Sequence, residues 1–390
     1  MSGERSIYLD NHATTRCDPR VLEAMLPWFG ECYGNAASVE HAYGWEAAEA
    51  VARAREEVAA LIQADPREIV FTSGATEANN LALKGALAAA GSGARLVTSA
   101  AEHRAILDPA RRLERAGFGV AVLPVDRCGT VGPAAIDEAL RREPATLVSI
   151  MAANNEVGTL SPLDEIGAVC RGRGALLHTD AAQAIGRVPF DVRALPVDLA
   201  SISAHKLYGP KGVGALWVRR RRRIRIEPLL DGGGHENRLR SGTLPVPLIV
   251  GFGAACRIVR ESLLDESRRI AALRDRLWDS LNARISDLRR NGDPERRLPG
   301  NLNVSVPGVD GDALLAGLKE IAVSSGSACS TADPEPSHVL RAMGVSEDLC
   351  RASLRFGLGR FNTADEIDRA AAIVAGVVQR LREGAAVRAK

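Results

Sequence analysis

The sequence lacks several features that mark special classes of protein. Its seven cysteines are scattered and include no Cys-x-x-Cys pair, which argues against a disulfide framework and a zinc site. No apolar run approaches the roughly 20 residues needed to cross a membrane, and the N-terminus (Met-Ser-Gly-Glu-Arg-Ser) has no apolar signal core. Lys and Arg together number 50 against 48 Asp and Glu, so no overall basic charge favours nucleic acid. These absences predict a cytoplasmic protein with no membrane anchor, no resident metal and no direct nucleic acid binding.

One local run of charge needs its own interpretation. Five consecutive arginines at 219–223 follow a strand-like segment at 214–218 and precede the alternating residues 224–226. We interpret the run as a solvated hairpin edge, where charged side chains prevent further strand pairing. An RNA-binding patch is the less favoured alternative.

Strand-like and helix-like segments alternate through the first two thirds of the chain. Strands are expected at 68–72, 95–98, 120–123, 146–151, 175–179 and 199–204, with helices at 75–84, 107–115, 133–142 and 163–171. This alternation predicts an α/β fold with a mostly parallel central sheet covered by helices on both faces.

A second, smaller α+β unit is expected after a long helix at about 247–285. It contains strands at 301–305, 322–323 and 352–356, a helix at 313–318, and a final helix that opens with the capping-box residues Thr363 and Glu366. We therefore predict a large domain formed by residues 17–264. Residues 1–16 and 265–390 are expected to form the small domain.

Polar residues cluster where the predicted parallel strands end. In such sheets ligands bind at the carboxyl ends of the strands, so we expect these side chains to share one site. They are Ser73, Thr76, His103, Asn154, Asn155, Glu156, Asp180, Gln183, Ser203, His205 and Lys206.

Lys206 is the residue around which this site is expected to form. It ends an apolar segment and is followed by a turn rich in glycine and proline at 209–214. A partly desolvated lysine loses its proton more readily, and the neutral amine forms a Schiff base with an aldehyde. The aldehyde cofactor that matches is pyridoxal phosphate (PLP). The alternative, an exposed lysine at a strand end, becomes less favourable when the other strand ends are considered.

Two further features match PLP. The turn before the helix at 75–84 offers free backbone N–H groups and the hydroxyl of Thr76 to an anion, although it also resembles an ordinary helix cap. Asp180, at the end of the preceding strand, is placed to keep a pyridine nitrogen protonated.

Three residues are candidates for the chemistry on a substrate. Cys329 lies among small, flexible residues at 324–331, with prolines beyond, so its thiol is a candidate nucleophile on a moving loop. His103 could stack on a planar ring and transfer protons. Arg355 could bind a carboxylate through two hydrogen bonds. Each could instead be a bystander when considered alone.

Eight motifs, taken together and in this order, point to one family. They are Thr72-Ser-Gly-Ala-Thr-Glu77, Asn154-Asn-Glu156, Asp180-Ala-Ala-Gln183, His205-Lys-Leu-Tyr-Gly-Pro-Lys-Gly212, Gly232-Gly-Gly-His235, Arg240-Ser-Gly-Thr243, Ser324-Ser-Gly-Ser-Ala-Cys329 and Arg355-Phe-Gly-Leu-Gly-Arg360. The chain resembles the cysteine desulfurases of the NifS/IscS type, which are class V, fold-type I PLP enzymes. The resemblance runs from about Tyr8 to the final helix.

The resemblance implies a role for individual residues. Lys206, Cys329 and His103 would be catalytic, Asn35, Asn155 and Arg355 would bind the substrate, and Thr243 would reach the phosphate from the other subunit of a homodimer. The implied cofactor-binding set is Ala75, Thr76, His103, Asn155, Asp180, Gln183, Ser203, His205, Lys206 and Thr243.

The resemblance also implies a reaction. Sulfur would leave L-cysteine, giving L-alanine and a persulfide on Cys329. The loop around Cys329 resembles group I members, which pass the sulfur to acceptor proteins such as an iron–sulfur scaffold or a sulfur relay for thio-cofactors or tRNA. Cys329 is also a candidate transient iron–sulfur ligand.

The chain departs from the family pattern at several positions. Asn11, His12 and Arg16 replace the usual residues of the N-terminal motif, and Ala36 stands where proline is common. We expect these changes not to touch the chemistry. The chain ends soon after the final helix, without the longer tail that housekeeping members use to dock the iron–sulfur scaffold, so the sequence leaves docking to that scaffold open.

Rival hypotheses remain at this point. A selenocysteine lyase or a small-amino-acid aminotransferase would share the fold, but an aminotransferase would not need Cys329. A non-catalytic scaffold would bind no yellow cofactor.

Overall fold

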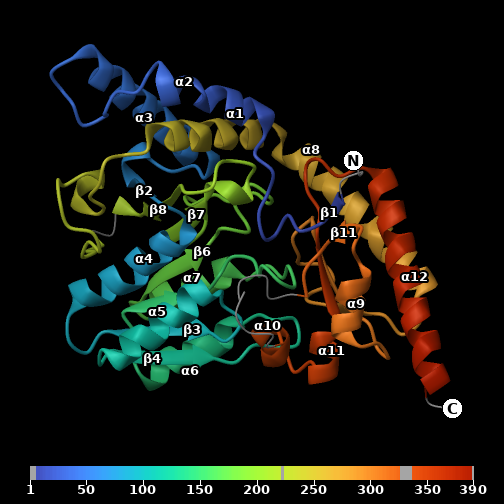
Figure 1. The fold of residues 1–390 in the computed structure, drawn as a ribbon. Coiled ribbons are helices and arrows are strands. Elements are labelled where there is room, and N and C mark those ends of the chain that lie inside the picture. Colours follow the sequence, from blue (N-terminus) through green and yellow to red (C-terminus); the bar gives the residue numbers. More distant parts are fainter. Residues whose placement is uncertain (1–5, 221–223, 326–335, 389–390) are drawn as a thin grey trace.

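The computed structural model describes residues 6–220, 224–325 and 336–388 (Figure 1). Its larger sheet has seven strands, in the spatial order β2 (Ile69–Thr72), β8 (Gly214–Val218), β7 (Leu199–Ser203), β6 (Leu176–Asp180), β5 (Leu147–Ser149), β3 (Arg95–Ser99) and β4 (Gly119–Leu123). Only β8 runs antiparallel to its neighbours β2 and β7, and the other pairs are parallel. The predicted mostly parallel sheet is confirmed.

Helices cover both faces of this sheet, because the strands bury side chains alternately on each side. In β2, Ile69 and Phe71 belong to the same hydrophobic core as α3 and α8, whereas Val70 packs with α4 and α5 on the opposite face. Figure 1 shows these two layers of helices on either side of the sheet. The helices of the large unit are α1 (Pro19–Met25), α2 (Pro27–Gly30), α3 (Ala42–Leu61), α4 (Ala75–Ala90), α5 (Arg104–Arg115), α6 (Pro133–Arg142), α7 (Leu163–Gly172) and α8 (Val246–Arg284), with short 3-10 turns η1 (Pro66–Glu68), η2 (Ala204–Lys206) and η4 (Glu236–Arg238).

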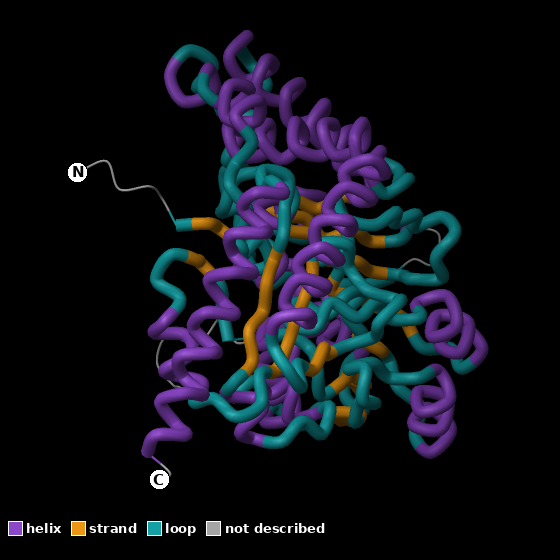
Figure 2. The backbone as a smooth tube through the Cα atoms, turned by 90° about the vertical axis from the view of Figure 1, so that its right-hand side faces the viewer, coloured by secondary structure: helices purple, strands orange, loops and turns teal. Residues whose placement is uncertain are grey.

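The small unit has two further sheets and its own hydrophobic core. β1 (Ile7–Tyr8) pairs in parallel with β11 (Ile321–Ala322), so the N-terminal strand joins the C-terminal part of the chain as predicted. An antiparallel sheet has the order β12 (Ser353–Gly357), β10 (Asn301–Ser305) and β9 (Arg289–Asn291). Its helices are α9 (Gly311–Gly317), α10 (His338–Ala342), α11 (Glu347–Arg351) and α12 (Ala364–Arg388). In Figures 1 and 2 both ends of the chain lie on this side of the molecule.

Helix α8 connects the two units. Its residues up to Val259 are buried in the core of the large unit, and from Ile270 onward its apolar side chains enter the core of the small unit. These separate cores support the proposed domain boundary near residue 264, which stays a prediction. The capping box at the start of α12 is present: Thr363 N–H donates to the Glu366 carboxylate, and Glu366 N–H donates to the Thr363 hydroxyl.

The hairpin edge expected at the arginine run is wrong for the part that the structure describes. β8 lies inside the sheet between two neighbours, and residues 224–226 form no strand. Arg219 donates to the backbone carbonyls of Val197 and Leu195, so this arginine binds the loop that precedes β7. The reason for the error is that one of the two partners of β8 is β2, which lies far away in the sequence. Within the described ranges, no helix is long and apolar enough to cross a membrane.

Candidate active site

A cavity of about 390 Å³ lies at the carboxyl ends of the parallel strands. It brings together eleven of the residues predicted from the sequence, although they come from elements far apart in the chain. These are Ser73, Ala75, Thr76, His103, Asn155, Asp180, Gln183, Ser203, His205, Lys206 and Arg355. Cys329 lies outside the described residues.

Lys206 enters the cavity from η2, directly after β7. Its Nζ donates hydrogen bonds to the carbonyl oxygens of His12 at 2.6 Å and Ala13 at 2.7 Å. The turn that carries Lys206 is bound to the N-terminal segment, because the backbone N–H and the hydroxyl of Thr15 both donate to the carbonyl of His205. These contacts orient the amine toward the cavity.

The N-terminus of α4 forms one end of the cavity. Its N-cap is Gly74, which has φ of 153° and offers no side chain to cap the helix. A Cβ added to Gly74 would meet nothing within 4 Å, so the space before the helix is open. A Cβ on Gly214 of β8 would lie 2.7 Å from the Cα of Gly74, and only glycine permits this close approach. The first N–H groups of α4 are thus available to an anion together with the hydroxyl of Thr76.

His205 lies beside the same end of the cavity. Its Nδ1 is 3.0 Å from the hydroxyl of Thr14. Burial, and the positive charges of Lys206 and Lys211, lower the pKa of His205 to about 4. At neutral pH the imidazole is therefore uncharged and can donate one hydrogen bond.

Asp180 is held by two donors. The side-chain Nδ2 of Asn79 donates to Oδ2 at 2.7 Å, and the backbone N–H of Ala182 donates to Oδ1 at 3.0 Å. Both contacts hold the carboxyl group in place at the cavity, where a pyridine nitrogen needs an acidic partner. Our sequence analysis missed Asn79. Its spacing of one helical turn after Thr76 could have indicated that both face the cavity.

His103 is the N-cap of α5. Its Nδ1 accepts a hydrogen bond from the backbone N–H of Ala105 at 3.1 Å, so in the neutral ring the proton is on Nε2. The neighbouring residue Glu102 is fully buried, and burial raises its pKa to about 8. The negative charge of Asp180 also raises this pKa, whereas a hydrogen bond from the Met151 N–H lowers it. Glu102 therefore adds little negative charge to the site at pH 7.

Arg355 projects from β12 into the cavity. Its Nη2 pairs with the carboxylate of Asp10 at 2.8 Å, and its Nη1 donates to the carbonyl of Asn155 at 3.2 Å. The backbone N–H of Arg355 donates to the carbonyl of Ser324. The strand that carries the guanidinium therefore also fixes the chain five residues before Cys329.

Four predicted residues do not line the cavity within one chain: Asn154, Glu156, Thr243 and Asn35. Asn154 and Glu156 are buried. Thr243 is exposed and lies beyond the cavity lining. Asn35 is also exposed, and its Oδ1 accepts from the backbone N–H of Ala37 at 3.0 Å. For Thr243 this placement is what the predicted contribution to the other subunit requires.

One of the N-terminal departures, His12, lies at the cavity. Its side chain is buried and lines the cavity. Its Nδ1 is 2.9 Å from Oε1 of Gln183. That this departure does not touch the chemistry stays a prediction. No local pattern in the sequence indicated that the turn after β1 contacts the end of β7.

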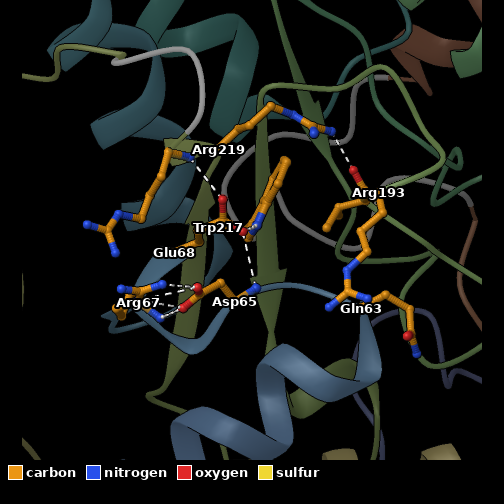
Figure 3. Close-up of a pocket in the computed structure, with 9 residues that line it drawn as sticks. Gln63, Asp65, Arg67, Glu68, Arg193, Trp217 and Arg219 are labelled. Atoms are coloured by element: carbon orange, nitrogen blue, oxygen red, sulfur yellow. Dashed lines mark hydrogen bonds and ion pairs between the residues drawn. The ribbon is translucent and has the colours of Figure 1, made fainter.

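A second, larger cavity of about 580 Å³ lies at the opposite end of β2, β7 and β8 (Figure 3). In this cavity Arg67 pairs with Asp65, and the indole N–H of Trp217 donates to Glu68. None of the predicted site residues lines it. Size is therefore a poor guide to the active site here. Among the described residues, no group of three or more His, Cys, Asp or Glu side chains could hold a metal ion.

Comparison with known proteins identifies the family. Residues 7–370 match the family described as aminotransferase class V, and the chain is 56% identical to the cysteine desulfurase IscS of Anaeromyxobacter sp. (strain Fw109-5) over 378 residues, which cover 97% of this chain and 93% of that protein. The chain belongs to the IscS-type cysteine desulfurases.

Two solved structures share the fold of this desulfurase. A NifS-like protein has a TM-score of 0.89 and 38% identity, with 96% of this chain and 100% of that chain covered. SspA in complex with cysteine has a TM-score of 0.82 and 36% identity, with 92% and 100% covered.

Membership of this family implies PLP as the cofactor, and the cavity of the desulfurase fits it. The uncapped end of α4 suits a phosphate group, Asp180 suits a ring nitrogen, and Lys206 suits an aldehyde. The volume of about 390 Å³ is within the usual range for small-molecule sites. All three groups line this one cavity.

Proposed function

We propose that this desulfurase removes sulfur from L-cysteine and leaves it as a persulfide on Cys329, with L-alanine as the other product. In this reaction the Cβ–S bond of the substrate breaks and an S–S bond to Cys329 forms, while Cβ gains a proton in place of sulfur. The observation that carries the proposal is the juxtaposition of Lys206, Asp180 and Arg355 in one cavity.

Bound PLP would supply an electron sink for the carbanion at the substrate Cα. The chain's own residues supply the rest of the chemistry. The Nζ of Lys206 would take the Cα proton, because this lysine lines the cavity directly at the end of β7. Asp180 would hold a proton at the ring nitrogen, and His103, which lines the same cavity, would transfer protons at the substrate.

Arg355 would bind the substrate carboxylate. Its planar guanidinium offers donors in a fork that matches a carboxylate. The ion pair with Asp10 at 2.8 Å keeps the guanidinium at the cavity wall. Cysteine would thus be oriented with its carboxylate toward β12, the strand whose backbone also holds Ser324.

Replacing Cys329 with alanine tests the proposed sulfur transfer. Purified wild type, yellow with cofactor, should release equimolar alanine and sulfide from L-cysteine in the presence of dithiothreitol. Cys329→Ala should keep the yellow cofactor, but its rate of forming both products should fall at least about 100-fold, because the nucleophile is gone. Cys128→Ala is the matched control, since Cys128 is partly exposed and does not line the cavity. Full turnover by Cys329→Ala would instead place the protein among the ordinary PLP lyases or aminotransferases.

The persulfide would be passed to acceptor proteins, either an iron–sulfur scaffold or a sulfur relay for thio-cofactors or tRNA. We place this reaction in a reducing cytoplasm. The six cysteines within the described ranges are all free thiols, which suits a compartment that keeps thiols reduced.

We propose further that the active enzyme is a homodimer. A group of large apolar side chains on α1, α2 and the start of α3 is exposed in the single chain. They are Leu22, Leu26, Phe29, Tyr33, Val39, Tyr43 and Trp45. Apolar surface of this extent usually marks an interaction site. Ion pairing of Arg240 with Glu77 at 2.9 Å holds the loop before Thr243 beside α4, with Thr243 itself facing outward.

Mixing two inactive variants tests whether Thr243 acts in the site of the partner. Thr243→Asp should repel the phosphate of the neighbouring site, and Lys206→Ala should inactivate its own. After the two are unfolded together and refolded, random pairing should restore about a quarter of the wild-type activity, because half of the dimers would contain one intact site. Mixed Lys206→Ala and Cys329→Ala, whose residues are not assigned across the interface, serve as a comparison. No recovery with Thr243→Asp would contradict the shared site.

A further inference from the structure

His12 and Gln183 are joined by two hydrogen bonds. Nε2 of Gln183 donates to the carbonyl oxygen of His12 at 2.9 Å, and Oε1 of Gln183 lies 2.9 Å from Nδ1 of the His12 ring. A backbone carbonyl can only accept, so the amino group of Gln183 must face it. It follows that Oε1 faces the ring and that Nδ1 of His12 carries a proton.

The same carbonyl of His12 also accepts a hydrogen bond from Lys206 Nζ at 2.6 Å. One residue of the N-terminal turn therefore contacts both the lysine and the glutamine of the proposed cofactor site. The N-terminal turn packs closely on β12, where a Cβ on Gly357 would lie 2.7 Å from the backbone nitrogen of His12 and 2.9 Å from its Cδ2. The glycine thus lets both the backbone and the ring of His12 approach the strand.

The imidazole is held in one orientation between two acceptors. It is 1% exposed. Its Nδ1 faces Oε1 of Gln183, and its Nε2 lies 3.2 Å from the carbonyl oxygen of Gly300. Burial, and the positive charges of Arg187, Arg355 and Lys206, hold the pKa of His12 well below its usual value, despite the hydrogen bond to Gln183. The contact on each side of the ring keeps Nδ1 directed at the Gln183 carbonyl as a donor.

We propose that His12 is a positioning residue of the cofactor site, because its ring and its backbone carbonyl together fix which hydrogen-bonding group Gln183 presents to the cavity. Oε1 of Gln183 accepts from the His12 ring, and one hydrogen of Nε2 is donated to the His12 carbonyl. The second hydrogen of Nε2 can therefore be donated into the cavity, which Gln183 lines. Its acceptor would be the ring oxygen of bound PLP. This inference rests on the proposed function, in which Gln183 contacts that oxygen.

The predicted signature is spectroscopic. Bound cofactor loses a proton as the pH rises, and its ring oxygen then carries a negative charge. An N–H donor stabilises this charge. If the donor is no longer oriented, the pH midpoint of the proton loss should rise. We expect His12→Leu, in the cofactor-loaded enzyme, to raise the pH midpoint of the visible absorbance change by about half a unit to one unit, the effect of one hydrogen bond. His12→Asn, whose Nδ2 can replace Nδ1 as donor, should keep the wild-type midpoint.

A double-mutant cycle separates this role from packing. In a Gln183→Ala background, His12→Leu should shift the midpoint no further. His12→Ala, which adds no volume, tests the same shift if His12→Leu does not fold. Equal midpoints for the Leu and Asn variants, or a shift by His12→Leu that persists without Gln183, would overturn the positioning role. A wild type with no visible cofactor band would instead overturn the proposed function.

Discussion

Replacing Lys206 with alanine is expected to reduce alanine and sulfide formation by at least about 1,000-fold, because the residue would serve both as the cofactor's attachment point and as the base at the substrate Cα. The structure supports both roles, since Nζ is directed into the cavity by the carbonyls of His12 and Ala13. The protein should still fold, since the turn around residue 206 is held by backbone contacts to Thr15.

The measurement combines activity with chemical trapping. Borohydride reduction of the wild type should fix the cofactor irreversibly to the peptide containing Lys206, as read by mass spectrometry, and should leave Lys206→Ala unlabelled. Lys211→Ala is the matched control, because Lys211 also lines the cavity but lies in the turn at 209–214 and not at the end of β7. It should still be labelled at Lys206. Labelling of the Lys211 peptide in the wild type would show that the wrong lysine was assigned.

Replacing Arg360 with alanine is expected to destabilise the protein by about 3 kcal/mol. The change would leave the partly buried carboxylate of Glu266 without its arginine and would leave Asp18 with Arg20 as its one remaining arginine partner. Arg360 pairs with Asp18 at 2.7 Å and makes two hydrogen bonds of 2.9 Å to Glu266 on α8. Its guanidinium also lies 4.2 Å from the ring centre of Tyr208. One side chain therefore ties the start of α1, the turn after Lys206 and the long helix to the C-terminal unit.

An exposed ion pair in the same protein gives the control. Arg276 and Asp368 are paired at 2.5 Å, but their side chains are 52% and 48% exposed. Arg276→Ala should cost no more than about 1 kcal/mol. Denaturant unfolding of both variants, cofactor loaded, measures the two effects. Equal costs would mean that the buried network around Arg360 contributes no more than a surface pair.

The effect of Arg360→Ala should depend on pH in a defined direction. Hydrogen bonds from Arg20 and Arg360 hold the pKa of Asp18 well below its usual range, although burial of the carboxyl group acts to raise it. A carboxyl whose pKa is lowered by folding stabilises the protein above its unfolded pKa of about 3.9 and loses this contribution as the pH falls below it. The stability difference between wild type and Arg360→Ala should therefore be constant from pH 8 to pH 5 and shrink below about pH 4.

Much of the fold followed from local pattern. The alternation of apolar strands with amphipathic helices predicted the parallel sheet, because each strand–helix unit carries its own periodicity and caps. Lys206 and Asp180 could be placed together for the same reason: both end apolar strands, and in a parallel sheet all such ends lie at one edge. Thr363 and Glu366 marked the start of α12 through a purely local hydrogen-bond pattern.

Features that depend on pairing between distant segments could not be predicted in this way. The short strand β9 and the helices α10 and α11 were missed, since segments of three to five residues carry too few side chains to show a period. The position of β8 inside the sheet depended on its pairing with β2, which lies more than 100 residues earlier in the chain.

The sequence by itself determined the α/β class, the position of Lys206 and Asp180 at one edge of the sheet, and the motifs of the desulfurase family, because these follow from local periodicity and residue type. Only the tertiary structure decided that Arg355 is paired with Asp10, that Asn79 holds Asp180 and that His12 binds Gln183. The physical reason is that hydrogen bonds and burial join residues brought together by folding, across separations of 101 to 345 positions in the chain.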